Sequence, residues 1–89
     1  EAFRIGLANR VVEHETLMDE ARKLASRLKS GPLYALGVTK ELMEREANMD
    51  LAQALELEAE AQARCMQMSD FKEGFKAFLE KRAPIFNCL

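Results

Sequence analysis

Few side chains in this sequence have the type and spacing needed for acid–base, nucleophilic or metal chemistry. His14 is the only histidine, and it lies between Glu13 and Glu15. No serine or cysteine sits in a glycine-flanked nucleophile turn, no glycine-rich loop could hold a phosphate, and no histidine pair could hold a metal. We therefore interpret His14 as a solvated loop residue, and we expect no catalytic residue and no metal site in this segment.

Glu58 is the carboxylate whose position suggests a special role. It lies on the otherwise apolar stripe of a predicted helix, where a carboxylate must be paired, be hydrogen-bonded or reach water. It could be a catalytic acid, or a structural carboxylate bonded to a nearby arginine, amide or hydroxyl. We favour the structural role, because ion pairs inside folded proteins also produce unusual carboxylates.

Composition excludes several kinds of partner. The chain carries 13 Lys and Arg against 15 Asp and Glu, a net charge of −2, and its basic residues are scattered rather than clustered against nucleic-acid phosphates. No apolar stretch approaches the roughly 20 residues of a membrane-spanning helix, and no targeting signal opens the chain. Cys65 and Cys88 fit neither a zinc site nor a disulfide framework. We expect a cytoplasmic protein with incidental thiols and no nucleic-acid or membrane partner.

The elements that would position these side chains are predicted to be helices, which makes the fold class all-α. Gly6 and the stretch from Leu7 to Val12 predict a short strand or extended lead. Apolar residues at helical spacing then predict four helices: Thr16 to Ser30, Pro32 to the break at Asn48, Leu51 to Met68, and Phe71 to Lys81. Three acidic or polar pairs resemble N-terminal caps: Thr16 with Asp19, Asp50 with Gln53, and Asp70 with Glu73. Gly37 is either a weak point or a close-packing site.

The last predicted helix carries an aromatic stripe and ends in two cations. Phe71, Phe75 and Phe78 recur at helical spacing and are expected to form core or interface. Lys81 and Arg82 could stabilise the negative end of the helix dipole, or they could bind an anion. Spacing alone does not decide between these roles.

The size of the chain predicts that it associates with another surface. A chain of 89 residues buries only roughly 60% of its unfolded surface, and its apolar stripes exceed what four short helices cover easily. The chain also begins with Glu1 rather than Met, and its first residues read like the end of a longer element. We therefore expect self-association, and we expect residues 1–89 to be one helical segment of a longer protein.

Three ordered segments carry a resemblance to a known family: EAFRIGLANRVV, LASRLKSGPLYALGVTKELM and LELEAEAQARCMQMSDFKEGFKAFLEKRAPIF. Their order and spacing resemble the C-terminal portion of the crotonase superfamily, especially the enoyl-CoA hydratase/isomerase family. The resemblance covers nearly the whole chain. It implies a helical part that follows a larger N-terminal domain and drives assembly into trimers or dimers of trimers.

The resemblance also implies a function for the parent protein, which would act on an acyl-CoA thioester. The family's oxyanion-binding N–H groups and catalytic glutamates lie upstream of the IGLANRVV stretch, so the resemblance assigns no catalytic residue to this chain. Phe78 and Lys81 match positions that help hold the adenine and phosphate of CoA, often across a subunit boundary. Coenzyme A would be part of the substrate, with no other cofactor. The alternative is a free-standing helical module that binds a partner protein without catalysis.

Overall fold

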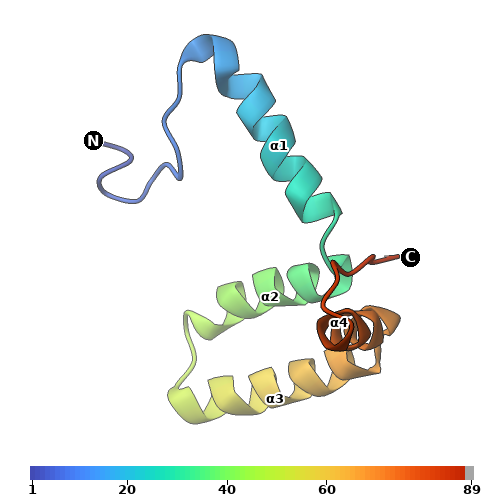
Figure 1. The fold of residues 1–89 in the computed structure, drawn as a ribbon. Coiled ribbons are helices and arrows are strands. Elements are labelled where there is room, and N and C mark those ends of the chain that lie inside the picture. Colours follow the sequence, from blue (N-terminus) through green and yellow to red (C-terminus); the bar gives the residue numbers. More distant parts are fainter. Residues whose placement is uncertain (88–89) are drawn as a thin grey trace.

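A computed structural model describes residues 1–87 of the chain, and all of their regular structure is helical (Figure 1). The elements are the 3-10 turn η1 (His14–Thr16) and the helices α1 (Leu17–Lys29), α2 (Leu33–Glu46), α3 (Leu51–Gln67) and α4 (Ser69–Leu79). Residues 1–87 contain no strand. The prediction of an all-α chain of four helices is therefore confirmed. The prediction that Cys88 is an incidental thiol concerns a residue outside the described range.

The lead before η1 is irregular rather than a strand. Its first residues form a hydrogen-bonded turn, in which the Ile5 N–H donates to the Glu1 carbonyl at 3.0 Å. Gly6 has a φ of +79°, which a residue without a Cβ adopts easily. Further along, the Arg10 guanidinium pairs with the Glu20 carboxylate of α1 at 3.1 Å. The lead is thus held to α1 by a side chain and not by a sheet, so of the two alternatives, strand or extended lead, residues 1–87 exclude the strand.

The helix boundaries follow local sequence signals only in part, since one of the three predicted caps is confirmed and two are wrong. At the start of α3, the Gln53 N–H donates to Asp50 Oδ1 at 2.9 Å and the Asp50 N–H donates to Gln53 Oε1 at 3.4 Å, which is the predicted capping box. At the start of α1, the Thr16 hydroxyl instead donates to the Glu13 carbonyl at 3.0 Å. Pro32 is the cap residue before α2 rather than its first helical residue.

The junction between α3 and α4 is a single extended residue. Met68, with φ −72° and ψ 150°, is both the C-cap of α3 and the N-cap of α4. The last helix therefore begins at Ser69, before the predicted start at Phe71, and Asp70 lies within its first turn. The predicted capping pair of Asp70 and Glu73 is wrong, because a residue inside the helix cannot take the cap position.

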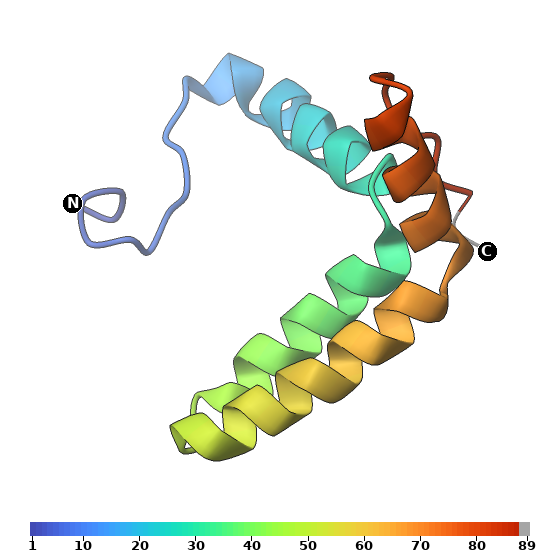
Figure 2. The ribbon, with the colours of Figure 1, turned by 60° about the horizontal axis from the view of Figure 1, so that its bottom comes forward.

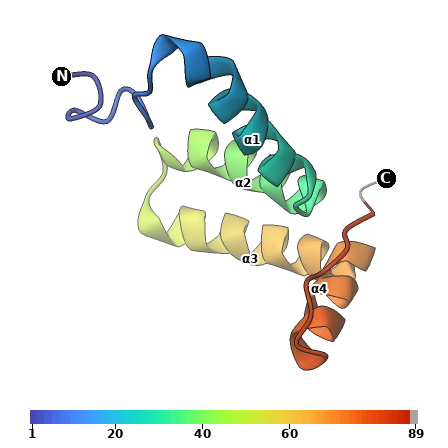
Figure 3. The ribbon, with the colours of Figure 1, turned by 45° about the horizontal axis from the view of Figure 1, so that its top comes forward.

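The helices form an open arrangement with a very small buried core. Helices α2 and α3 lie side by side and antiparallel, and α4 turns across the end where α3 finishes (Figure 1). Helix α1 projects away from this group and has no buried residue (Figures 2 and 3). Leu42, Ala61 and Ala77 are the buried apolar residues of the described chain. The small side chains Ala61 and Ala77 suit close helix approach.

The dimensions confirm how open this arrangement is. The radius of gyration is 16.7 Å, whereas a compact chain of this length would have about 12 Å. Gly37 is not a close-packing site, since no atom beyond the adjacent backbone of its own helix lies within 4 Å of the position that a Cβ would take there. None of the described helices combines the length and apolar character that crossing a membrane requires.

Candidate functional site

The two residues predicted to contact a ligand come together at the C-terminal end of α4. Phe78 lies in the last turn of the helix with 78% of its surface exposed, and Lys81 follows two residues after the helix ends and is also exposed. The Lys81 N–H donates to the Phe78 carbonyl at 3.2 Å, so the backbone joins the two residues directly. An aromatic face and an ammonium group are therefore presented to solvent from one helix end.

Lys81 differs from the neighbouring cations at this end of α4. Lys76 Nζ lies 3.9 Å from Glu80 Oε1, and Arg82 pairs with both Glu73 and Glu80. Lys81 has no ion pair with any residue in the range 1–87. Its ammonium is therefore available to an external anion. The guanidinium of Arg82, by contrast, is occupied by the carboxylates of Glu73 and Glu80, so of the two cations Lys81 is the one left to bind an external anion.

The backbone at Lys81 adopts a conformation that usually belongs to glycine. Lys81 has a φ of +53°, the one positive value among the non-glycine residues described. The Arg82 N–H donates to the Ala77 carbonyl at 3.0 Å, and together with the bond from Lys81 to Phe78 this completes a Schellman motif. The motif needs a left-handed residue directly after the C-cap residue, which is Glu80, and here that residue is Lys81.

Glu73 holds the segment that follows Lys81 against α4. The two Nη atoms of Arg82 donate to the two oxygens of Glu73 at 2.6 and 3.1 Å, and the Ile85 N–H donates to Glu73 Oε1 at 2.9 Å. These bonds from Arg82 and Ile85 lower the pKa of the Glu73 carboxyl to about 2. We call the bonds of Glu73 with Arg82 and Ile85 the Glu73 clasp. Helical spacing does not predict it, because Glu73 and Arg82 are nine residues apart and the spacing of Glu73 from Asp70 predicts a capping pair instead.

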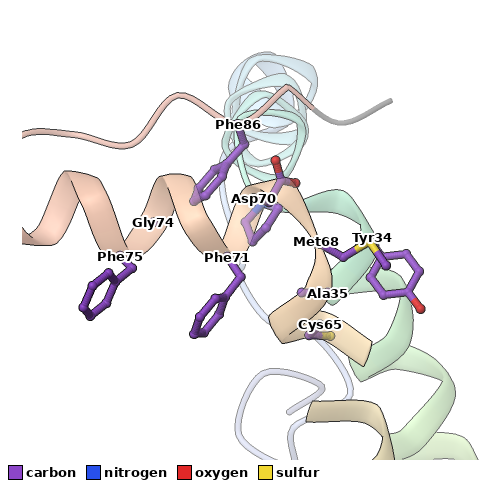
Figure 4. A pocket seen from close by; sticks show the side chains of 10 residues that line it. Tyr34, Ala35, Cys65, Met68, Asp70, Phe71, Gly74, Phe75 and Phe86 are labelled. Carbon is purple, nitrogen blue, oxygen red and sulfur yellow. The ribbon is translucent and has the colours of Figure 1, made fainter. Parts of the chain in front are cut away.

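The clasped segment forms one wall of an apolar cavity. Phe86 reaches back across α4, with its Cε1 atom 3.8 Å from the position of a Cβ on Gly74 (Figure 4). The cavity has a volume of about 300 Å³ and contains Asp70 as its one ionisable carboxyl group. Its lining residues come from the start of α2, the end of α3, α4 and the tail: Pro32, Tyr34, Ala35, Cys65, Met68, Asp70, Phe71, Gly74, Phe75 and Phe86. Two of the predicted aromatic stripe residues, Phe71 and Phe75, thus line a cavity, whereas Phe78 does not.

Glu58 lies in one of the environments that the sequence allowed for it, because its carboxylate reaches water. It is exposed, and its charged neighbour is a second carboxylate, Glu46 of α2, rather than an arginine. Glu46 Oε1 is buried without a hydrogen-bond partner among the described residues. Burial, and then the charge of Glu58, raise the pKa of the Glu46 carboxyl. Glu58 therefore has no arginine partner among residues 1–87, and its carboxylate is hydrated.

The remaining candidates do not join these groups. His14 is exposed, as expected, but it belongs to the 3-10 turn η1 rather than to an irregular loop. Cys65 is a free thiol, and it lines the apolar cavity. Among residues 1–87, no three His, Cys, Asp or Glu side chains come together as a metal site requires.

Comparisons with known proteins agree with one another. A sequence model of the family described as enoyl-CoA hydratase/isomerase matches residues 1–88. The chain is 42% identical to a crotonyl-CoA hydratase of Syntrophomonas wolfei over 86 residues, and this aligned region is 97% of the chain. It is 36% identical over 86 residues, again 97% of this chain, to a 1,2-epoxyphenylacetyl-CoA isomerase of Escherichia coli K12.

A solved structure extends the agreement to three dimensions. A protein from Mycobacterium abscessus, assigned as an enoyl-CoA hydratase/isomerase, superimposes with a TM-score of 0.95 at 38% identity over 99% of this chain. The chain spans about a third of the length of the relatives it matches: 33% of each curated relative named above and 34% of the solved one.

Proposed function

Because the chain belongs to the enoyl-CoA hydratase/isomerase family, we propose that it is the C-terminal helical part of an enzyme that acts on acyl-CoA thioesters. Its four helices match the C-terminal helical part of the crotonase fold. In this proposal the helices assemble subunits and contact the CoA portion of the substrate. The protein would work in the cytoplasm, with coenzyme A as part of the substrate and with no other cofactor, nucleic acid or membrane involved.

The observation that carries the assembly role is the large exposed surface. The chain exposes 7811 Å². A compact monomer of 10.1 kDa would expose about 5,300 Å², so the excess is about 2,500 Å². Covering this excess on each of two copies would bury about 5,000 Å² in total, which is the size of a permanent interface, roughly 2,000–5,000 Å² over both partners.

The apolar side chains along this surface are the ones that such an interface would cover. Leu24 and Leu28 of α1 are 47% and 50% exposed, and Phe75 of α4 is 60% exposed. An apolar face this extensive marks an interaction surface. We propose that the rest of the longer protein and other copies of it, in a trimer or hexamer as the family resemblance implies, cover this surface together.

The CoA contact is proposed for Phe78 and Lys81. A flat aromatic face can stack on a purine, and an ammonium group can bind a phosphate. Both side chains are exposed at one helix end, and Lys81 has no acidic partner among the described residues. Their placement meets the physical requirements for such a contact.

The type of reaction would be set outside this chain. The two curated relatives carry the names of a hydratase and an isomerase, yet each matches nearly the whole chain at similar identity. A segment shared by proteins with different reactions is not expected to select between them. We therefore propose no proton-transfer role for any residue here, and turnover of crotonyl-CoA by the purified chain would contradict this.

The test of the CoA contact is Lys81→Ala in the complete enzyme, with Lys76→Ala as the control. KM is compared for a CoA thioester and for a pantetheine thioester that lacks the nucleotide. Loss of a charged hydrogen bond of about 1.5–3 kcal/mol raises KM for the CoA ester by roughly 10- to 150-fold. Added salt should reduce the difference between wild type and variant. An equal loss with both substrates, or no loss with either, would refute the phosphate contact.

Assembly is tested separately by sedimentation of the purified chain. Self-association that strengthens with concentration is the expected result. A well-folded monomer at high concentration would contradict it, and would favour the alternative of a helical module that binds a different protein.

A further inference from the structure

The conformation of Lys81 needs an explanation, because it is disfavoured for a residue with a side chain. A left-handed residue brings its Cβ close to the following carbonyl oxygen, and glycine is therefore usual at this position. Lys81 nevertheless has a φ of +53°. Such a conformation persists only where the surrounding structure enforces it, and it occurs preferentially at functional sites.

Restraints on both sides of Lys81 enforce this conformation. On the helix side, the N–H groups of Lys81 and Arg82 donate to carbonyls in the last turn of α4, at 3.2 and 3.0 Å. On the tail side, the Glu73 carboxylate accepts hydrogen bonds from both Nη atoms of Arg82 and from the N–H of Ile85. One carboxylate thus fixes the chain at one residue and at four residues after Lys81. The backbone between the end of α4 and Ile85 cannot straighten while these bonds persist.

From this geometry we propose that Glu73 is a positioning residue, which acts through Arg82 to hold Lys81 in the left-handed conformation and to aim its ammonium at the phosphate of a CoA substrate. This inference rests on the CoA contact proposed above. Its new element is the assignment of a role in substrate binding to Glu73, which lies inside α4 and does not itself touch the ligand.

The clasp also explains why Arg82 is not a second phosphate ligand. Its Nε atom donates to Glu80 Oε2 at 2.5 Å while both Nη atoms bind Glu73. A guanidinium saturated by two carboxylates has little positive charge left to offer an anion, because bidentate pairing with carboxylates is its strongest interaction. Arg82 therefore holds the tail against α4, and Lys81 is the cation that binds the phosphate.

Breaking the clasp should change where the Lys81 ammonium points. Without the bonds to Glu73, Arg82 and Ile85 lose their anchor on α4. Lys81 can then return to the right-handed region, which is the more favourable one for a residue with a Cβ. Its side chain would leave the helix end in another direction, although its charge and its place in the sequence are unchanged.

The first experiment measures the backbone at Lys81 directly in the purified 89-residue chain. NMR of isotope-labelled protein reports φ through the HN–Hα coupling and through the intraresidue HN–Hα Overhauser effect, which is strong for a left-handed residue. We expect the left-handed pattern in the wild type, and its loss in Glu73→Ala. Glu41→Ala is the matched control, because Glu41 also pairs with an arginine on an exposed helix surface, Arg45 at 3.3 Å, far along the sequence from Lys81. A left-handed Lys81 in Glu73→Ala would overturn the inference.

The second experiment measures binding in the complete enzyme with the same two variants. We expect Glu73→Ala to raise KM for a CoA thioester by about 3- to 10-fold more than KM for the pantetheine thioester, with kcat for the pantetheine thioester unchanged. Glu41→Ala should leave both KM values at the wild-type level. A merely structural role would lower thermal stability and affect both substrates equally, and that result would overturn the inference.

The variant Lys81→Ala separates failure of this inference from failure of the proposed function. If Lys81→Ala shows no selective loss with the CoA ester, the CoA contact itself is refuted and the role of Glu73 in binding is refuted with it. If Lys81→Ala is selective and Glu73→Ala is not, only the positioning role is overturned. When both hold, the double variant should lose no more selectivity than Lys81→Ala alone, because Glu73 acts through Lys81.

Discussion

Replacing Lys81 with glycine should stabilise the protein even though it removes a charged side chain. The φ of +53° at this residue costs a residue with a Cβ roughly 1–2 kcal/mol, which glycine does not incur. Glycine loses more backbone entropy on folding, which offsets about 0.5–1 kcal/mol of that gain. The net stabilisation is therefore about 0.5–1 kcal/mol. Lys81→Ala keeps the Cβ, so its unfolding free energy should lie within about 0.5 kcal/mol of the wild type.

Two measurements on the 89-residue chain check this prediction. Thermal unfolding followed by far-ultraviolet circular dichroism should give a midpoint about 2–8 °C higher for Lys81→Gly. Native-state hydrogen exchange of the Arg82 amide, which donates to the Ala77 carbonyl, should slow by about two- to fivefold. If glycine destabilises the chain, or if alanine stabilises it equally, Lys81 is not held in the left-handed region and the reasoning is refuted.

Four further outcomes are expected. In denaturant titrations, Leu42→Ala should lower the free energy of unfolding by about 2–5 kcal/mol, because Leu42 is 6% exposed. The control Met43→Ala, at a position 70% exposed, should change this free energy by less than about 0.5 kcal/mol. Gly37→Ala, within α2 and with open space at its Cβ, should raise it by about 0.5–1 kcal/mol. Glu46→Gln should stabilise the chain at neutral pH but not in acid. Burial and a neighbouring carboxylate raise the pKa of Glu46 on folding, so the wild type loses stability as pH rises through that pKa. An equal effect of the substitution at both pH values would contradict this. Because the pKa of Glu73 falls from 4.5 to about 2 on folding, the clasp should lose its stabilising effect as pH falls from 4.5 towards 2, and acid titrations of wild type and Glu73→Gln should converge over that range.

The sequence by itself determined the local elements. Apolar spacing placed four helices in the correct order, and the Gly31–Pro32 break falls between α1 and α2. The Asp50–Gln53 capping box is present as predicted. These features depend on bonds between residues at most four positions apart, which a helical pattern specifies directly. The ordered motifs also carried the family resemblance that the comparisons confirm.

Local sequence signals predicted the wrong role for Glu73, which could either cap a helix with Asp70 or bind the tail that follows α4. Glu73 has the spacing of a capping partner for Asp70. However, Met68 alone connects α3 to α4, so α4 begins at Ser69 and Asp70 lies inside the helix rather than at its cap position. The carboxylate is then available to Arg82 and Ile85. The choice between these roles depends on the path of the tail after α4, which no helical periodicity encodes.

The tertiary structure alone decided how distant segments meet. It placed Glu46 beside Glu58 across two helices, and it brought Phe86 back over Gly74 to form the wall of a cavity. It also put Lys81, a residue with a Cβ, in a left-handed position that composition would assign to glycine. Contacts between residues nine or more positions apart depend on the direction in which each helix leaves its neighbour. That direction is set by side chains packed together from several segments, so the sequence could supply the candidates Phe78 and Lys81 but not the contacts of Glu73 with Arg82 and Ile85.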